Sequence, residues 1–530
     1  MKSLTHHLMR RAATATPDHE AVVDRDRSVT YAQLDAATTR LAGAFLDAGL
    51  ARHDRVGIWL DKSLEEVWSI FAASKAGGVF VPINALLFPE QVEHIVRDCE
   101  PTVLVVSRSR MEPLLALLPR CPSVRAVFVA GGWDRDREGS VEIRSVERAI
   151  ADDPAQAPRD VGISRDLAAI LYTSGSTGKP KGVMLSHANL IAGSRIVSTY
   201  LGITDRERIL SVLPFSFDYG LNQLLTAVHH GATLVLITFR FPNEVVKAIV
   251  THRITGLAGV PPFWNVFTQS GSSVWKTELP TLRYITNSGG AVPKTLLDNL
   301  RRALPTTDVF LMYGLTEAFR STYLPPSEID RRPGSMGKAI PDTEIFVVGE
   351  DGRELARGEV GELVHRGPTV SLGYWGRPEE TARVIRPNPR LLPQLEGTEM
   401  VCYSGDLVRM DEDGYLYFVG RRDATIKCAG FRISPTEVEE IVLATGLVRE
   451  AAAVGVPDDL MGQAVVVAAV ARDGAPFDED EVIVKCAEHM PRYMVPRKVL
   501  AFPALPRNPN GKMDYPNVRK SVLAALGVES

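Results

Sequence analysis

Short apolar runs alternate with amphipathic stretches along most of the chain. The runs at 103–107 and 124–130 are predicted to be buried strands, and 90–98 carries its apolar positions at helical spacing. A helix is predicted over 221–230, followed by a strand over 232–237. Such alternation is typical of βαβ units that build parallel or mixed sheets. The pattern therefore predicts an α/β protein.

One segment between two predicted strands carries unusual chemistry. An apolar run at 168–172 enters it, a second run at 183–185 leaves it, and Ser186 is a predicted N-cap for a helix that begins near His187. The segment itself, YTSGSTGKPKG at 172–182, combines flexible glycines, hydroxyl donors and two lysines, a mixture suited to polyphosphate. A flexible linker is the alternative, but a loop held between buried strands favours a site. The residues predicted to hold phosphate are Thr173, Ser174, Gly175, Ser176, Thr177, Gly178, Lys179 and Lys181.

The spacing within this loop differs from that of a Walker A motif. Lys179 follows a G-x-x-G pair and precedes Pro180, whereas a Walker A lysine follows G-x-x-x-x-G and precedes Ser or Thr. A P-loop NTPase is therefore disfavoured.

Seven further segments stand in a fixed order along the chain. They are KAGGVFVPIN (75–84), MYGLTEA (312–318), GELVHRGPTVSLGYW (361–375), YSGDL (403–407), GRRDATIKCAGFRI (420–433), PRYMVP (491–496) and NPNGKMD (508–514). Together with the loop at 172–182, this set resembles the adenylate-forming enzymes, which include acyl-CoA synthetases, nonribosomal peptide synthetase adenylation domains and firefly-type luciferases. The resemblance covers nearly the whole chain.

The resemblance implies both an architecture and a reaction. The expected fold is a large N-terminal domain of mixed and parallel sheets flanked by helices, 1–422, and a small mobile α+β C-terminal domain, 423–530, with Asp423 as the hinge. In the expected reaction a small-molecule carboxylic acid attacks ATP, with Mg²⁺ as cofactor, to give an acyl-adenylate and pyrophosphate. The acyl group then passes to a phosphopantetheine thiol, on coenzyme A or on an acyl carrier protein. An aryl or fatty acyl-CoA synthetase and a luciferase-like oxygenase remain alternatives.

Several motif side chains suit this chemistry. Tyr313 offers an aromatic face for adenine, Thr316 a hydroxyl for phosphate, and Glu317 a carboxylate of the kind that Mg²⁺ accepts. The resemblance implies that Asp406 binds the ribose hydroxyls and that Arg421 contacts ribose or phosphate. Gly289 and Gly290 complete the predicted nucleotide site.

Lys512, near the C-terminus, is implied to bridge the acid's carboxylate and the α-phosphate. Two anions that approach one another need a positive charge where further negative charge develops. A non-catalytic protein of this fold would be expected to have lost Lys512, Glu317 or Lys181, and all three are present.

The segment FSFDYG at 215–220 resembles that of amino-acid-activating domains more than the F-H type of many acyl-CoA synthetases. Asp218 is therefore a candidate anchor for a substrate ammonium, with a helix cap as the alternative. Arg320 is a candidate for pairing with a second carboxylate, with a surface or phosphate-contacting arginine as the alternative. The resemblance to those domains implies a pocket wall that also includes Tyr219, Asn222, Gly259, Ile285, Asn287, Met312 and Ser321. This polar wall predicts a small polar acid, leaning towards one with an amine.

Composition and charge limit the partners and the cellular compartment that the sequence predicts. With 530 residues, a net charge of −4 and a pI near 6.3, the chain offers no electrostatic case for binding nucleic acid or an anionic membrane. It shows neither a signal-peptide pattern nor a membrane-spanning run. Five scattered cysteines predict free thiols in a reducing cytoplasm. The proline-rich stretch at 386–397 is predicted to be a surface insertion.

Overall fold

The computed structural model describes residues 3–173, 180–422, 424, 426–428, 431–458, 462–472, 477–490, 492, 494–509 and 511–528. Ser174, Gly175, Ser176, Thr177, Gly178 and Lys179 of the predicted phosphate loop, and the predicted hinge Asp423, lie outside the described residues.

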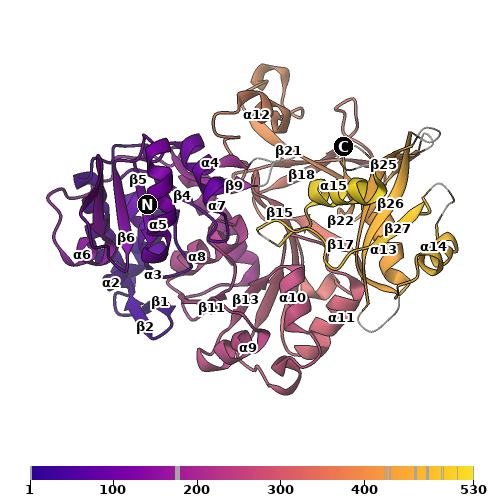
Figure 1. The fold of residues 1–530 in the computed structure, drawn as a ribbon, viewed down its shortest axis with the longest axis horizontal. Coiled ribbons are helices and arrows are strands. Elements are labelled where there is room, and N and C mark those ends of the chain that lie inside the picture. The colour runs from indigo at the N-terminus through magenta and orange to yellow at the C-terminus, as the bar shows by residue number, and fades with distance from the viewer. Residues whose placement is uncertain are drawn as a thin grey trace.

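Three sheets organise the described chain (Figure 1). The largest follows the path β18 (Glu344–Val348), β19 (Val360–Arg366), β21 (Met400–Met410), β22 (Leu416–Arg421), β17 (Ser335–Ala339), β16 (Ala318–Leu324), β15 (Asp308–Leu315), β14 (Tyr284–Asn287), β13 (Gly256–Gly259), β11 (Arg208–Ser211), β12 (Thr233–Leu236), β1 (Glu20–Asp24) and β2 (Arg27–Thr30), with β20 (Ile385–Pro387) paired to β21. Its segment from β15 to β1 is parallel, and the remaining pairs are antiparallel.

The second sheet is mostly parallel and follows the path β10 (Lys181–Ser186), β9 (Leu167–Thr173), β4 (Val79–Pro82), β3 (Arg55–Trp59), β5 (Val103–Ser107), β6 (Ala126–Ala130), β8 (Val141–Ser145) and β7 (Arg137–Glu138). The third follows β24 (Phe431–Ile433), β23 (Ile426–Cys428), β26 (Gly462–Ala471) and β25 (Val448–Asp458), with β27 (Lys498–Ala501) paired to β26.

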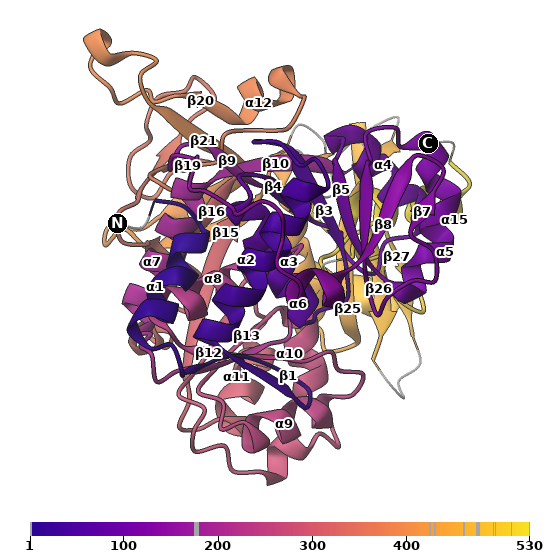
Figure 2. The same ribbon diagram turned by 90° about the vertical axis from the view of Figure 1, so that its left-hand side faces the viewer.

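Helices cover these sheets and fill the space between the first two (Figure 2). They are α1 (His6–Ala15), α2 (Tyr31–Asp47), α3 (Leu64–Lys75), α4 (Pro89–Cys99), α5 (Met111–Leu117), α6 (Val146–Ala151), α7 (His187–Leu201), α8 (Asp218–His230), α9 (Pro242–Thr251), α10 (Pro261–Phe267), α11 (Lys294–Ala303), α12 (Pro378–Val384), α13 (Pro435–Ala444), α14 (Glu479–Ala487) and α15 (Tyr515–Leu526).

One apolar core joins the first two sheets. It combines Phe45 of α2, Phe71 of α3 and Leu224 of α8 with strand residues such as Phe80 and Leu234, all fully buried. Because both sheets share this core, the N-terminal part packs as one body. The mixed α/β architecture predicted from the sequence is confirmed by this arrangement of sheets and helices.

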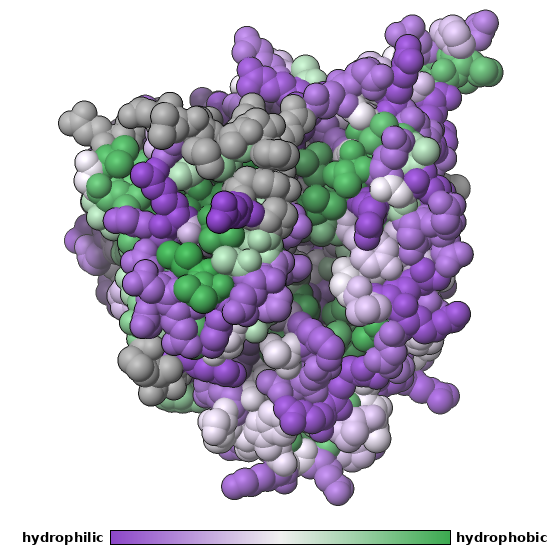
Figure 3. Space-filling model, turned by 90° about the vertical axis from the view of Figure 1, so that its right-hand side faces the viewer, coloured by the Kyte–Doolittle hydropathy of each residue, from purple (hydrophilic) through white to green (hydrophobic). Residues whose placement is uncertain are grey.

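The third sheet has its own cores, one on each face. Val438 and Val482 belong to the first, Val518 and Val522 belong to the second, and neither core contains a residue before Ile426. The sheet and its helices form the yellow part of Figure 1, on the right. Figure 3 looks onto this side and shows a largely hydrophilic face with separate apolar patches.

Local signals explain where two helices begin and end. Ser186 caps α7 by accepting a hydrogen bond from the backbone N–H of Asn189, as the sequence predicts. Helix α8 starts at Asp218, three residues before the predicted start, and ends at Gly231, whose φ of 75° suits a residue without a side chain.

The insertion predicted at 386–397 lies at the surface, with Leu392 66% exposed. It nevertheless begins inside β20, which pairs with β21, and the orange chain after β20 projects from the body in Figure 2. All five cysteines are free and buried. In the described part of the chain, no helix is both long and apolar enough to cross a membrane.

Candidate active site

Lys512 reaches from the C-terminal part to the N-terminal part. Its backbone N–H donates to Asn508 Oδ1 over 3.0 Å, which closes the turn that carries it, and Asn84 Nδ2 donates to Pro509 O over 3.4 Å. Lys512 Nζ lies 5.3 Å from the centroid of the Phe217 ring. The described structure therefore places this ammonium beside the segment that carries Asp218.

Gly289 makes room for the lysine. Its φ is 81°, and a Cβ built on it would stand 3.3 Å from Lys512 Cε. A side chain here would be strained and would crowd the lysine. The neighbouring Gly290 accepts a hydrogen bond from Asn287 Nδ2 over 3.1 Å, which fixes the loop after β14.

Tyr313, Asp406 and Arg421 form one hydrogen-bonded group. The Tyr313 hydroxyl donates to Asp406 Oδ2, and Arg421 Nη1 donates to Asp406 Oδ1 over 3.0 Å. Burial, helped by the charge of Asp406, raises the pKa of Tyr313 well above its usual range. Tyr313 therefore stays a neutral donor, and the geometry puts its ring beside the carboxylate that is predicted to bind ribose.

Glu317 is oriented by a residue that sequence reasoning did not assign. The Tyr374 hydroxyl donates to Glu317 Oε1 over 2.6 Å, and Lys181 Nζ lies 5.7 Å from the Tyr374 ring while pairing with Glu380. Tyr374 lies within the motif at 361–375, but its position in that motif does not predict a function for it. Thr316, next to Glu317, is buried, and Thr173 ends β9 at the entrance to the loop.

A single carboxylate is what Mg²⁺ needs when phosphates and water supply its other ligands. Glu317 offers that carboxylate, already held by Tyr374. The residues thus fit the ion in the expected role.

Asp218 and Arg320 meet in the interior. Arg320 Nη1 lies 3.6 Å from Asp218 Oδ2, and the Arg320 Cζ atom lies 4.6 Å from the centroid of the Tyr219 ring. Arg320 Nε and Nη2 are buried and have no hydrogen-bond partner among the described residues. The guanidinium therefore keeps two unused donors in the interior.

The backbone conformation at Arg320 directs its side chain into the interior. Arg320 has a φ of 88°, a conformation that a residue with a side chain seldom adopts, at a register shift between β15 and β16. A Cβ on Gly314 would stand 3.1 Å from Arg320 Cα, so a glycine there permits the close approach. The alternative of a surface arginine is wrong, since the Arg320 side chain is 2% exposed.

Asp218 does not cap a helix. The N-cap position of α8 is Phe217, no side-chain cap bond is formed, and Asp218 is the first helical residue. Its carboxylate instead faces Arg320 and gains from the positive end of the helix dipole.

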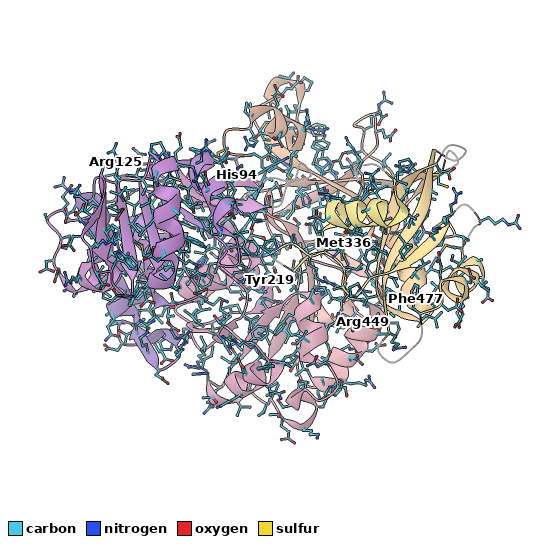
Figure 4. All side chains as sticks on the ribbon, in the orientation of Figure 1. His94, Arg125, Tyr219, Met336, Arg449 and Phe477 are labelled. Atoms are coloured by element: carbon cyan, nitrogen blue, oxygen red, sulfur yellow. The ribbon has the colours of Figure 1, made fainter. Side chains whose placement is uncertain are left out.

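A cavity of about 30 Å³ is lined by Tyr219, Asn222, Thr286 and Met312, among others. The Tyr219 hydroxyl and Thr286 Oγ1 are 2.5 Å apart, and Asn222 Nδ2 is buried without a partner among the described residues. Figure 4 shows Tyr219 near the middle of the molecule. Of the predicted pocket residues, Tyr219, Asn222 and Met312 line this cavity.

One other group of possible metal ligands exists among the described residues: His6, His7 and Asp160. Arg10 donates to both Asp160 oxygens, over 2.7 and 3.3 Å. His7 Nδ1 accepts backbone N–H groups of Ser3 and Leu4, so in the neutral ring Nε2 carries the proton and has no lone pair for a metal. The group is an ion-pair anchor for α1.

Comparison with known proteins agrees with this geometry. Residues 9–375 match the family model described as AMP-binding enzyme, and 437–512 match that of the AMP-binding enzyme C-terminal domain. A feruloyl-CoA synthase of Amycolatopsis sp is 31% identical over 514 residues, covering 96% of this chain and 97% of the relative.

Two solved structures share the fold along nearly their whole length. ATP-bound MatB from Rhodopseudomonas palustris has a TM-score of 0.85 at 27% identity, covering 98% of this chain and 99% of MatB. The anthranilate CoA ligase AuaEII in complex with anthranoyl-AMP has a TM-score of 0.88 at 25% identity, covering 99% and 98%. The first family match spans more than half of the chain, so this protein belongs to the AMP-binding enzyme family and is an AMP-forming acid–thiol ligase.

Proposed function

We propose that this ligase activates a small polar carboxylic acid, one that carries a second carboxylate or an amine, and transfers the acyl group to coenzyme A. The observation that supports the proposal most is Arg320, buried beside Asp218 with Nε and Nη2 unpartnered among the described residues.

The energetics favour a polar substrate. A charged donor left buried without a partner costs about 1 to 3 kcal/mol or more, and a substrate oxygen that accepts from Arg320 removes this cost. A plain fatty or aryl acid leaves Nε and Nη2 of Arg320 without an acceptor. A site built to hydrogen-bond its substrate can reject an analogue without that group by about 10⁴-fold.

The two charges stand at opposite ends of an aromatic wall. Lys512 Nζ lies over the Phe217 ring, that ring lies 6.1 Å from the Tyr219 ring, and Arg320 stacks on Tyr219. We assign the reacting carboxylate to the lysine end and the second polar group to the arginine end. Asp218 would take an ammonium if the acid carries one.

The remaining residues suit the nucleotide. Tyr313, with Asp406 and Arg421, is assigned to adenosine, and Glu317 would hold Mg²⁺. Bound Mg²⁺ would neutralise charge on the phosphates. Lys512 would stabilise the charge that develops as an acid oxygen attacks the α-phosphate and pyrophosphate leaves. The thiol then attacks the acyl carbon, and AMP leaves.

Coenzyme A is the proposed acceptor because the relatives are named as a feruloyl-CoA synthase and an anthranilate CoA ligase. Transfer to an acyl carrier protein is the other outcome that the experiment would reveal. Anthranilate, the substrate named for AuaEII, is itself a small acid with an amine.

The test is an acid-dependent ATP–pyrophosphate exchange screen. Matched acids with and without an amine and a second carboxylate are compared on wild type and on Arg320→Met, and the acyl product is then offered coenzyme A or a carrier protein. Preference for a polar acid, lost in the variant, is expected. Best activity on unsubstituted fatty or aryl acids, unchanged by the variant, would contradict the proposal.

A further inference from the structure

The turn that carries Lys512 is tied to its sheet on both sides. Before the turn, Arg507 Nη2 donates to Glu450 Oε2 on β25 over 2.6 Å. After the turn, Tyr515 begins α15, and its hydroxyl lies 2.9 Å from both carboxylate oxygens of Glu439 on α13. In Figure 1 the chain before α15 runs towards the centre of the molecule.

Glu439 is a buried junction of three elements. Its side chain lies on α13, its Oε1 accepts the backbone N–H of Ala453 on β25 over 2.8 Å, and both its oxygens face Tyr515 on α15. The residue is 8% exposed, and burial raises the pKa of its carboxyl to about 7. A buried polar network with its partners in place specifies one arrangement of the elements that it joins.

We infer that Glu439 and Tyr515 are positioning residues for Lys512: their hydrogen bonds fix the start of α15, and so place the lysine turn against Phe217 and Gly289. The inference rests on the function proposed above for Lys512. Only two residues separate Lys512 from Tyr515, so a shift at the helix start is passed directly to the lysine. A displacement of about 1 Å at a reacting centre can cost 10²-fold in rate.

A purely structural role makes a different prediction. Helix α15 is also held by Val518, Val522 and Leu523, which pack in the core on that face of the sheet. If the Tyr515–Glu439 bonds only stabilise the domain, their loss lowers the melting temperature and affects both half-reactions alike. If they place Lys512, their loss lowers the rate of adenylate formation but leaves the rate of acyl transfer to the thiol nearly unchanged.

The experiment compares Tyr515→Phe and Glu439→Leu, which remove the hydroxyl and the carboxylate of this contact, with wild type in the full chain. Two rates are measured: pyrophosphate exchange with the acid found in the screen above, and transfer from pre-formed acyl-adenylate to coenzyme A. We expect kcat for exchange to fall about ten- to a hundred-fold with little change in KM for the acid, and transfer to stay within about twofold. Val522→Ala is the matched control, since it loosens the same helix and should leave the ratio of the two rates unchanged.

Lys512→Ala separates failure of this inference from failure of the proposed function. If Lys512→Ala leaves pyrophosphate exchange intact, the catalytic role that we assign to Lys512 is wrong. If Lys512→Ala abolishes exchange but Tyr515→Phe and Glu439→Leu change the ratio no more than Val522→Ala does, the positioning inference is overturned. The double variant should be no worse than Glu439→Leu alone, because that substitution already removes the bonds to Tyr515, and additive losses would also overturn the inference.

Discussion

Asp218 and Arg320 form a buried ion pair: Nη1 and Oδ2 are 3.6 Å apart, and the two side chains are 5% and 2% exposed. The sequence predicts separate roles for them, Asp218 as an anchor for an amine and Arg320 as a partner for a carboxylate. Because the two side chains pair, each compensates the charge of the other. Neither can therefore be changed without leaving a buried charge behind.

This pairing predicts coupled effects on stability. Asp218→Asn or Arg320→Met alone should each destabilise the protein by about 3 to 5 kcal/mol, because breaking a buried pair strands one charge. The double variant should recover much of that loss, since no charge remains. Urea unfolding of the four proteins measures the coupling energy, and strictly additive losses would show that the two residues do not interact.

A second prediction concerns Lys512. Lys512→Ala should lower adenylate formation by about 10² to 10³, which is the usual effect of removing one electrostatic contact to a transition state. Transfer from pre-formed acyl-adenylate should be largely retained. Pyrophosphate exchange and single-turnover thioester formation check the two steps, and equal losses in both would refute the assignment.

The contact between Tyr313 and Asp406 gives a third prediction. Tyr313→Phe keeps the ring but removes the hydroxyl that donates to Asp406. A hydrogen bond to a charged group contributes about 1.5 to 3 kcal/mol, so KM for ATP should rise about ten-fold or more while kcat changes less.

The control for this prediction is Tyr403→Phe, on the same strand as Asp406. It should leave KM for ATP unchanged. Equal effects of the two variants would mean that the Tyr313 hydroxyl has no particular role in binding the nucleotide.

Local features of this fold could be predicted from the sequence, because they depend on neighbouring residues. The capping of α7 by Ser186 and the end of α8 at Gly231 are of this kind. The sequence predicts a start for α8 that is three residues too late, since the apolar run begins after Asp218, and the prolines around β20 obscure that strand.

The pairing of Asp218 with Arg320 and the φ of 88° at Arg320 could not be predicted in this way. Both depend on the tertiary fold, which places β15 and β16 next to the start of α8. The same holds for Glu439 and Tyr515, 76 positions apart in the sequence, whose residue types carry no sign of their contact. Tyr374 lay within a recognised motif, but only the structure shows its bond to Glu317.

The last prediction uses the raised pKa of Glu439. Burial raises this pKa from 4.5 to about 7, against the lowering effect of hydrogen bonds from the Ala453 N–H and the Tyr515 hydroxyl, and the charge of Glu440 adds to the rise. A carboxyl whose pKa is higher in the folded state contributes stability that is fully present below about pH 4.5 and is lost as the pH rises through 7. Tyr515 remains protonated throughout, because burial and Glu439 raise its pKa.

Glu439→Gln removes this titration while keeping the shape of the side chain. The stability of wild type relative to this variant should therefore fall between pH 5 and pH 8, by about 2 to 3 kcal/mol. Urea unfolding of both proteins across this range isolates the contribution, because every other titrating group is common to the two. A difference that stays constant with pH would mean that Glu439 titrates near its ordinary value, and a difference that grows with pH would mean that its ionised form is the stabilised one.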